Sequence, residues 1–248
     1  MGKKIIKFCK DEHNICKSGT TVQLGTLQYY QTNIDPNIKD SYEGKLKDVI
    51  CYDELRVHST ELLNELGTSA RFSGGGKVIF KNMVINTEIK NALIFCVSEF
   101  DESEVITADL GKQISSEYNS FYEIKDIQGF LSQVGKLLLE MWVEKVHDNE
   151  GIKIFGRAGS VGYVDEKEKR FDCVENAILS RKNRTMFDPI FLKLKKSQDN
   201  FDVDFTKNRE FRFSWILFDK FGKEFNLNKL VQNDLVRIDA SSLRKFCK

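Results

Sequence analysis

The chain has 248 residues, 41% of them hydrophobic and 30% charged, which suits one large domain or two small ones with a well-packed core. A formal net charge of +1 gives no reason to expect nucleic-acid binding driven by bulk charge, although it is compatible with a local basic patch. No segment approaches the roughly 20 apolar residues that span a bilayer, so we expect no contact with membranes.

The N-terminal sequence and the absence of linker-like segments predict a single cytoplasmic domain. The segment Met1–Lys7 returns to charge after two apolar residues, whereas a signal peptide needs an apolar run of about 7–15. Pro36 and Pro189 are the only prolines, and no Gly/Ser-rich linker or internal repeat divides the sequence. We therefore predict one domain, residues 1–248, located in the cytoplasm.

The first half of the chain is dominated by strand signals. Lys4–Cys9 predicts a short strand, and Val22–Tyr30 predicts a second strand or a strand followed by a turn. Asp35–Gly44 is rich in Pro, Gly, Asn and Asp, which predicts a loop. Lys77–Phe80 is rich in β-formers, and Ala92–Ser98 is a nearly continuous apolar run, which is typical of a central strand.

The second half begins with the clearest helix, which starts near Ile127. Its apolar residues recur at helical spacing over four turns: Ile127, Phe130, Leu131, Val134, Leu137, Leu138, Met141 and Trp142. Strand signals return at Ile152–Phe155, Gly162–Val164 and Phe211–Phe218. Because helices and strands do not alternate regularly, we predict the α+β class, with a mixed, largely antiparallel sheet and flanking helices.

The late strand carries the most informative pattern. Side chains alternate between the two faces of a strand, so Phe211, Phe213 and Trp215 share one face, which must be buried. Glu210 and Arg212 share the other face, so an acid and a base project together. This arrangement fits either a solvated sheet face with an ion pair or the polar wall of a ligand cleft.

Two patterns raise the question of metal chemistry. Cys9, His13 and Cys16 have the spacing of metal ligands, but no second Cys or His pair completes a zinc site, so incidental cysteines are the better interpretation. Glu123–Lys125 has the Glu-x-Lys form of a metal-dependent nuclease strand, with Asp109 upstream as a partner carboxylate. A chain this rich in charge also produces Glu-x-Lys by chance, and we expect no metal.

Several short motifs resemble those of a widespread bacterial family of uncharacterised domains. They are Leu24–Tyr30, Asp40–Gly44, Ala92–Ser98, Phe191–Lys193 and Asn208–Phe213. The family typically shows a GTL-x-YYR strand, a DPxEG loop, an apolar IFC-S strand and a late strand of the form F-x-K followed by QEYRF. The resemblance covers residues 4–216, but Gln31 replaces the usual Arg and Ser41 the usual Pro. The first change weakens any role for a basic group there.

This family is distantly similar to the ADP-ribosyltransferase-like superfamily, which is an analogy at the level of the fold. Those enzymes use a basic residue or His on an early strand, an aromatic or hydroxyl residue on the next, and a Glu on a late strand. The resemblance therefore implies an ADP-ribosyltransferase-like sheet, NAD as the substrate and Glu210 as the catalytic residue. A carboxylate at the ribose stabilises the positive charge that develops when the nicotinamide bond breaks.

The resemblance also implies binding roles for residues in the early segments and the late strand. Tyr29 or Tyr30 would stack on the nicotinamide or the ribose. Basic side chains would neutralise the pyrophosphate, and the candidates are Lys7, His13 and Arg212. Asp40 and Glu43 would lie on a loop that borders the cleft.

Three hypotheses follow. The first is an NAD-dependent ADP-ribosyltransferase or NAD glycohydrolase that acts as a bacterial toxin or antiphage-defence effector, with a protein or nucleic-acid target and a cognate inhibitor or defence-system partner. The second is a non-enzymatic sensor or interaction module whose Glu210/Arg212 face binds a partner or ligand. The third is a metal-dependent nuclease that uses Asp109, Glu123 and Lys125.

Overall fold

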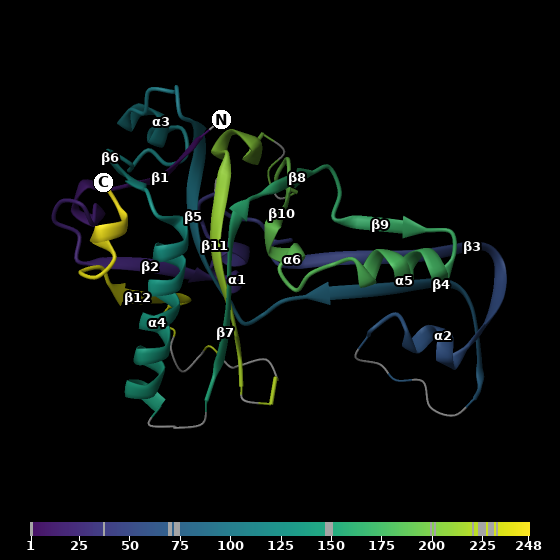
Figure 1. Cartoon of the computed structure of the whole chain (residues 1–248). Helices are drawn as coiled ribbons and strands as arrows, with labels where there is room; N and C mark the ends of the chain where they lie inside the picture. The colour runs from purple at the N-terminus through teal and green to yellow at the C-terminus, as the bar shows by residue number, and fades with distance from the viewer. Residues whose placement is uncertain are drawn as a thin grey trace.

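The structure is a computed structural model that describes residues 2–36, 38–68, 71, 75–146, 151–198, 200, 202–219, 221–222, 227, 231 and 233–248. Within these residues the fold is α+β, as predicted. It contains a seven-stranded sheet, a three-stranded sheet and a two-stranded sheet, with helices packed around them (Figure 1). Most strand pairs are antiparallel, and the seven-stranded sheet carries the candidate site.

The centre of the seven-stranded sheet is β5 (Ala92–Asp101). On one side β5 pairs antiparallel with β11 (Glu210–Phe218), from Ala92 to Ser98, and β11 pairs in turn with β7 (Lys153–Ser160). Both predicted strands in this region, the apolar run and the late aromatic strand, are therefore neighbours in the sheet. Both are covered on their two faces, which explains the nearly continuous burial along each of them.

On its other side β5 has two different partners, and the sheet is split between them. The partners are β1 (Lys3–Cys9), which pairs with residues 98–101, and β2 (Thr21–Thr26), which pairs with residues 93–94. Phe95, Cys96 and Val97 lie between these two stretches and have no strand partner on that side within the described chain. Beyond the split, β6 (Ser120–Ile124) extends the β1 half and β12 (Leu235–Asp239) extends the β2 half.

One face of the large sheet packs against α4 (Ile127–Val146), the helix predicted from Ile127. Asp126 accepts a hydrogen bond from the Gly129 amide at 2.8 Å, which satisfies a free donor at the start of the helix. The buried stripe of α4 meets the aromatic face of β11: the Phe130 and Phe213 ring centres are 5.1 Å apart. The Trp215 indole N–H donates to the Leu131 carbonyl at 3.1 Å. The predicted aromatic core is confirmed.

The opposite face is covered by α1 (Leu27–Thr32), α6 (Asp188–Phe191) and a small parallel sheet of β8 (Gly162–Val164) and β10 (Leu192–Leu194). These elements form a second apolar cluster against β5 and β11, made up of Leu27, Ala92, Ile94, Ile190, Phe191 and Ile216. The polar face of β11 is thus buried rather than solvated.

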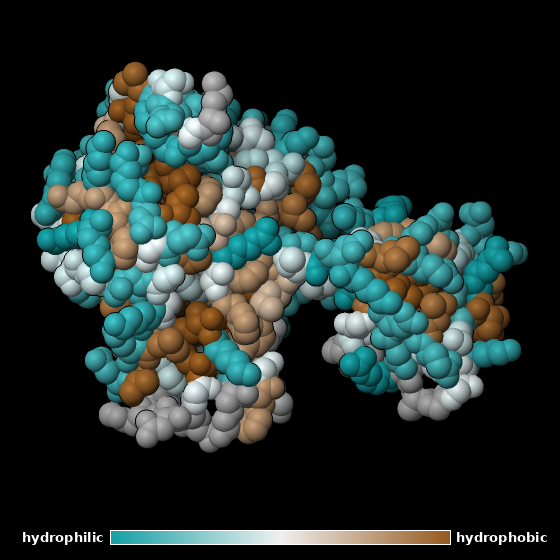
Figure 2. Space-filling model, viewed as in Figure 1, coloured by the Kyte–Doolittle hydropathy of each residue, from teal (hydrophilic) through white to brown (hydrophobic). Residues whose placement is uncertain are grey.

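A second lobe extends from the large sheet (Figure 1). Its sheet consists of β3 (Lys45–Ser59), β4 (Lys77–Glu88) and β9 (Glu168–Phe171), with α2 (Thr60–Asn64) and α5 (Val174–Lys182) on one face. It has its own core of buried residues, which are Ile50, Leu63, Leu66, Ile85, Val174, Ala177 and Ile178. Figure 2 shows exposed apolar surface on this lobe as well. The single-domain interpretation stays a prediction.

The segment Val22–Tyr30, predicted as a strand or a strand followed by a turn, is a strand as far as Thr26. The Thr26 hydroxyl accepts a hydrogen bond from the Tyr29 amide at 3.1 Å and so caps α1, which places Tyr29 and Tyr30 on a helix. The aromatic residues favoured the strand prediction, but the cap determines where the helix begins. The loop predicted at 35–44 is confirmed, apart from Asn37, which lies outside the described residues.

Three short elements complete the part of the fold that surrounds the site. A single 3-10 turn, η1 (Asp11–His13), follows β1, and α3 (Ala108–Lys112) precedes β6. A second 3-10 turn, η2 (Phe205–Asn208), leads into β11. In the described part of the chain, no helix combines the length and apolar character needed to cross a membrane.

Candidate functional site

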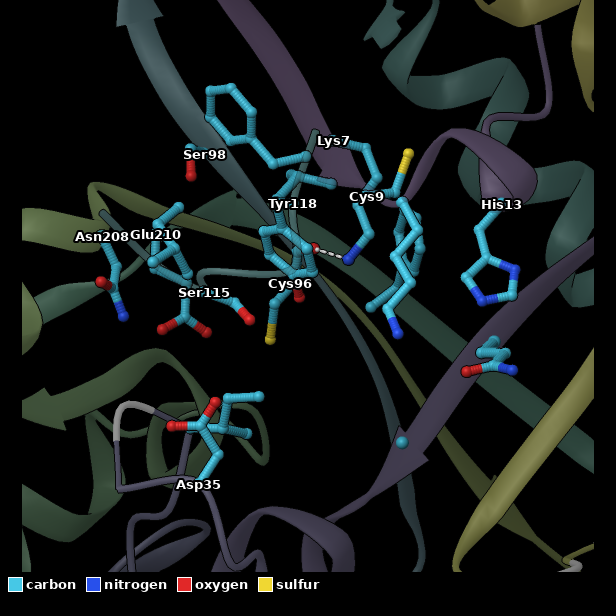
Figure 3. Close-up of a pocket in the computed structure, with 18 of the residues that line it drawn as sticks. Lys7, Cys9, His13, Asp35, Cys96, Ser98, Ser115, Tyr118, Asn208 and Glu210 are labelled. Carbon is cyan, nitrogen blue, oxygen red and sulfur yellow. Dashed lines mark hydrogen bonds between the residues drawn. The ribbon is translucent and has the colours of Figure 1, made fainter. Parts of the chain in front are cut away.

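The split in the sheet opens into a cavity of about 490 Å³. Small-molecule sites are typically about 300–1,000 Å³. The cavity walls come from β1, β2, α1, the unpaired stretch of β5, the segment before β6, Lys193 and the start of β11. Residues far apart in the sequence therefore meet at one place in the sheet (Figure 3).

Five residues expected from the sequence line this one cavity: Lys7, His13, Tyr29, Tyr30 and Glu210. They come from both halves of the split sheet and from the late strand. Arg212, Asp40 and Glu43 do not line it.

Lys7 lies in the split itself. Its ammonium donates to the Cys96 carbonyl at 2.9 Å and lies 4.7 Å from the centre of the Phe95 ring. The other two lysines in the lining have carboxylate partners at 2.9 Å, Lys10 with Glu117 and Lys193 with Glu210. Among the described residues, none supplies a carboxylate within ion-pair distance of Lys7. Burial lowers the pKa of Lys7, which shows the cost of keeping this charge out of water.

His13 occupies the end of the cavity away from Glu210 (Figure 3). It is the last residue of η1, and its side chain is 53% exposed, 3.6 Å from the Glu12 carboxylate. His13 is therefore at the mouth of the cavity, where it can meet a ligand from solvent.

The tyrosine pair of α1 lines the cavity next to the unpaired stretch of β5. The two rings of Tyr29 and Tyr30 pack edge to face with their centres 5.2 Å apart. The Tyr30 hydroxyl accepts from the Cys96 thiol at 3.4 Å, and burial raises the pKa of Tyr30 well above its ordinary value. Gly25 makes this packing possible, because a Cβ there would lie 2.8 Å from the Tyr30 ring.

Glu210 lies at the other end of the cavity and is held by two cations. Its Oε1 accepts from Arg212 Nε at 2.5 Å, and its Oε2 accepts from Lys193 Nζ at 2.9 Å. The side chain is 6% exposed. Burial alone raises the pKa of this carboxyl, but the charges of Arg212 and Lys193 outweigh burial and hold the pKa well below its usual range. Glu210 is thus ionised at neutral pH.

Arg212 and Glu43 lie behind the cavity wall. Arg212 makes a bidentate pair with Glu43, at 2.6 and 2.8 Å, and also donates to the Ile190 carbonyl. Both side chains are at most 1% exposed. The Arg212 guanidinium is fully used within the protein, so its position differs from the one expected for a pyrophosphate contact. The reason is that both faces of β11 are covered, which places this residue in a polar core.

Asp40 belongs to the same buried region. Its backbone amide donates to the Tyr30 carbonyl at 2.9 Å, and its Oδ1 accepts from the Tyr42 amide at 2.9 Å. Burial and the neighbouring Glu43 raise the pKa of Asp40. The Asp40–Gly44 loop therefore connects the tyrosine helix to the Arg212 cluster instead of bordering the cavity.

Lys193 and Asp35 are charged residues of the lining that the sequence did not single out. Lys193 lies on β10 and holds Glu210, and its ammonium is 4.3 Å from the centre of the Phe205 ring. Its signal was available, because it is the Lys of the Phe191–Lys193 motif. Asp35 lies in the loop after α1, and no pattern distinguished it from ordinary turn residues.

The two sets of residues considered for metals are not assembled. Burial raises the pKa of the Cys9 thiol to about 11, and Cys16 is exposed. Asp109 pairs with Lys112 at 2.8 Å, and Glu123 pairs with Lys125 at 2.9 Å. Throughout the residues that the structure describes, no three His, Cys, Asp or Glu side chains are placed to hold a metal ion together.

The buried glutamates make the fold sensitive to acid. Glu43 and Glu210 both have pKa values below their ordinary range in the folded state, so their contribution to stability is full above the unfolded pKa, near about 4.3. It is lost as the pH falls towards the folded values, while Asp40, with its raised pKa, acts in the opposite sense. We expect the free energy of unfolding in urea to fall between pH 5 and pH 3, and to fall less steeply in Glu43→Gln. A free energy of unfolding that stays level over this range contradicts the lowered pKa values of Glu43 and Glu210.

Comparisons of the chain with protein-family models, curated proteins and solved structures found no match.

Proposed function

We propose that the chain consumes NAD⁺, as an ADP-ribosyltransferase or an NAD glycohydrolase. The observation that supports this proposal is the cavity at the split of the sheet. It brings together an early basic residue, Lys7, the tyrosine pair Tyr29 and Tyr30, and the late-strand carboxylate Glu210. This is the combination that the sequence resemblance implies for an NAD site.

The charges suit a ligand that is anionic at one end. Lys7 is a cation without a carboxylate partner in the described chain, so a phosphate oxygen would compensate a charge that is costly to bury. The tyrosine rings offer flat apolar surface to a nicotinamide or a ribose.

Glu210 suits the step in which the bond between the ribose and the nicotinamide breaks. Breakage of the bond between ribose C1 and the nicotinamide nitrogen leaves neutral nicotinamide and positive charge on the ribose. A carboxylate that stays ionised stabilises this charge and accepts hydrogen bonds from the ribose hydroxyls. Arg212 and Lys193 each use one acceptor site, and a carboxylate has about four. The acceptor of ADP-ribose would be water, a protein or a nucleic acid. The proposed role as a toxin or antiphage-defence effector, with an inhibitor or defence-system partner, comes from the resemblance alone.

The direct test is to incubate the purified chain with NAD⁺ and measure nicotinamide by chromatography, with and without candidate acceptors. We expect release that depends on the protein. In Lys7→Met the KM for NAD⁺ should rise about 10- to 100-fold, because one charge-assisted hydrogen bond is lost, with a smaller change in kcat. Lys3→Met, on the exposed part of the same strand, is the control. No nicotinamide release under any acceptor condition would exclude the enzyme.

A second candidate is a sensor that binds a nucleotide without turnover. The observation that favours it is that both oxygens of Glu210 are already held by cations, which is also what a purely structural cluster would show. This candidate requires a rise in melting temperature with NAD⁺ or ADP-ribose, as mass action demands, and no release of nicotinamide.

A further inference from the structure

The proposed reaction needs a group that removes a proton from the attacking nucleophile. When water or an acceptor hydroxyl adds to ribose C1, its proton must leave, and a positioned base assists this step. Glu210 is unsuited to the role. Its two oxygens are tied to Arg212 and Lys193, and its pKa lies well below the usual range. The base must be a different group.

Most other titratable groups in the lining are unsuited as well. Burial raises the pKa of Cys9 to about 11 and that of Cys96 to about 12, so both thiols keep their protons. Burial likewise raises the pKa of Tyr118 to about 12. Glu117 is paired with Lys10 at 2.9 Å and its side chain is 63% exposed, so it faces solvent.

Asp35 has the position that the reaction requires. It lies in the loop that follows the tyrosine helix, lines the same cavity as Glu210 and is half-buried. Figure 3 shows the carboxylates of Asp35 and Glu210 pointing from opposite walls towards the space between them. Its negative charge also contributes to the raised pKa of Tyr118, another residue of the lining.

We propose that Asp35 is the general base of this site, acting on the nucleophile that attacks the ribose carbon held by Glu210. The inference rests on the proposed NAD⁺-consuming reaction. The bond between ribose C1 and the nicotinamide nitrogen breaks, and its electron pair leaves with neutral nicotinamide. The bond between C1 and the oxygen of water forms, and the proton of that water passes to an Asp35 oxygen and then to solvent. The products are ADP-ribose, nicotinamide and one proton.

The test is nicotinamide release by Asp35→Asn with and without sodium azide. Azide attacks carbon without having to lose a proton, so it replaces a missing base but not a missing ribose contact. We expect kcat to fall about 100-fold in Asp35→Asn, with less than a threefold change in the KM for NAD⁺. Azide should restore release and yield ADP-ribosyl azide, identified by its mass. Asp35→Ser is a second variant in case the amide disturbs folding, and Asp101→Asn, an exposed carboxylate on β5, is the control.

The outcomes separate the two proposals. Turnover by the wild type, together with loss and azide rescue in an Asp35 variant, supports the base. Undiminished hydrolysis in the Asp35 variants, or loss that azide does not restore, overturns it while leaving the NAD⁺-consuming activity in place. Absence of turnover in the wild type overturns the activity itself.

Discussion

Replacement of Arg212 by methionine is expected to lower the free energy of unfolding by about 3–5 kcal/mol. Arg212 is completely buried between Glu43 and Glu210, and its guanidinium makes hydrogen bonds to both carboxylates and to the Ile190 carbonyl. Methionine has a similar length but no charge, so it leaves two carboxylates in the interior without their main partner. An unpaired buried charge costs more than the pair contributes, which makes this the largest stability effect that we expect.

The measurement is urea unfolding followed by circular dichroism. Arg237→Met is the matched control, because Arg237 lies on β12 of the same sheet with its side chain exposed, and its replacement should change stability by less than about 0.5 kcal/mol. A double-mutant cycle with Glu43→Gln then isolates the coupling energy of the bidentate pair. A loss of less than about 1 kcal/mol in Arg212→Met would show that the cluster is not a buried ionic core.

Replacement of Glu210 by glutamine is expected to reduce nicotinamide release about 100- to 1,000-fold, on the basis of the proposed function. Glutamine keeps the shape of the side chain but removes the negative charge that would stabilise the ribose cation. The loss should appear in kcat, because this interaction strengthens as the positive charge develops. Azide should not restore this variant, in contrast to Asp35→Asn.

Glu99→Gln is the control for this experiment. Glu99 is a neighbouring carboxylate on β5 that does not line the cavity and whose side chain accepts from the Ser160 hydroxyl at 2.6 Å. Circular dichroism and melting temperature will show whether Glu210→Gln is folded, since Arg212 and Lys193 lose a partner. A folded Glu210→Gln protein with full activity would remove Glu210 from the mechanism.

Local patterns predicted several elements correctly. The helical spacing from Ile127 predicted α4, and the apolar run Ala92–Ser98 predicted the central strand. In both cases the periodicity directly reflects which side chains are buried. The strand β3 was missed because six of its residues are charged and its outer part is exposed. Its sequence therefore lacks the regular alternation of apolar residues that predicts a strand. It is held by pairing with β4 and β9 instead.

The candidate site was only partly accessible from the sequence. The alternation of side chains along a strand placed Glu210 and Arg212 on one face, but it does not reveal what covers that face. α6 and the Asp40–Gly44 loop cover Arg212, whereas Glu210 sits at the end of β11 and reaches the cavity. Lys193 and Asp35 reach the same cavity through contacts between distant segments, which the alternation of side chains along a strand does not encode.

The split in the sheet has a consequence for ligand binding. The β1 half and the β2 half of the sheet are connected through β5. Between them, residues 95–97 of β5 pair with neither β1 nor β2. A molecule that contacts Lys7 on one half and the tyrosine helix on the other would act as a cross-brace at this point. Part of its binding free energy would then become added stability of the sheet itself. Occupancy of the cavity and cohesion of the two halves are, in this sense, thermodynamically linked.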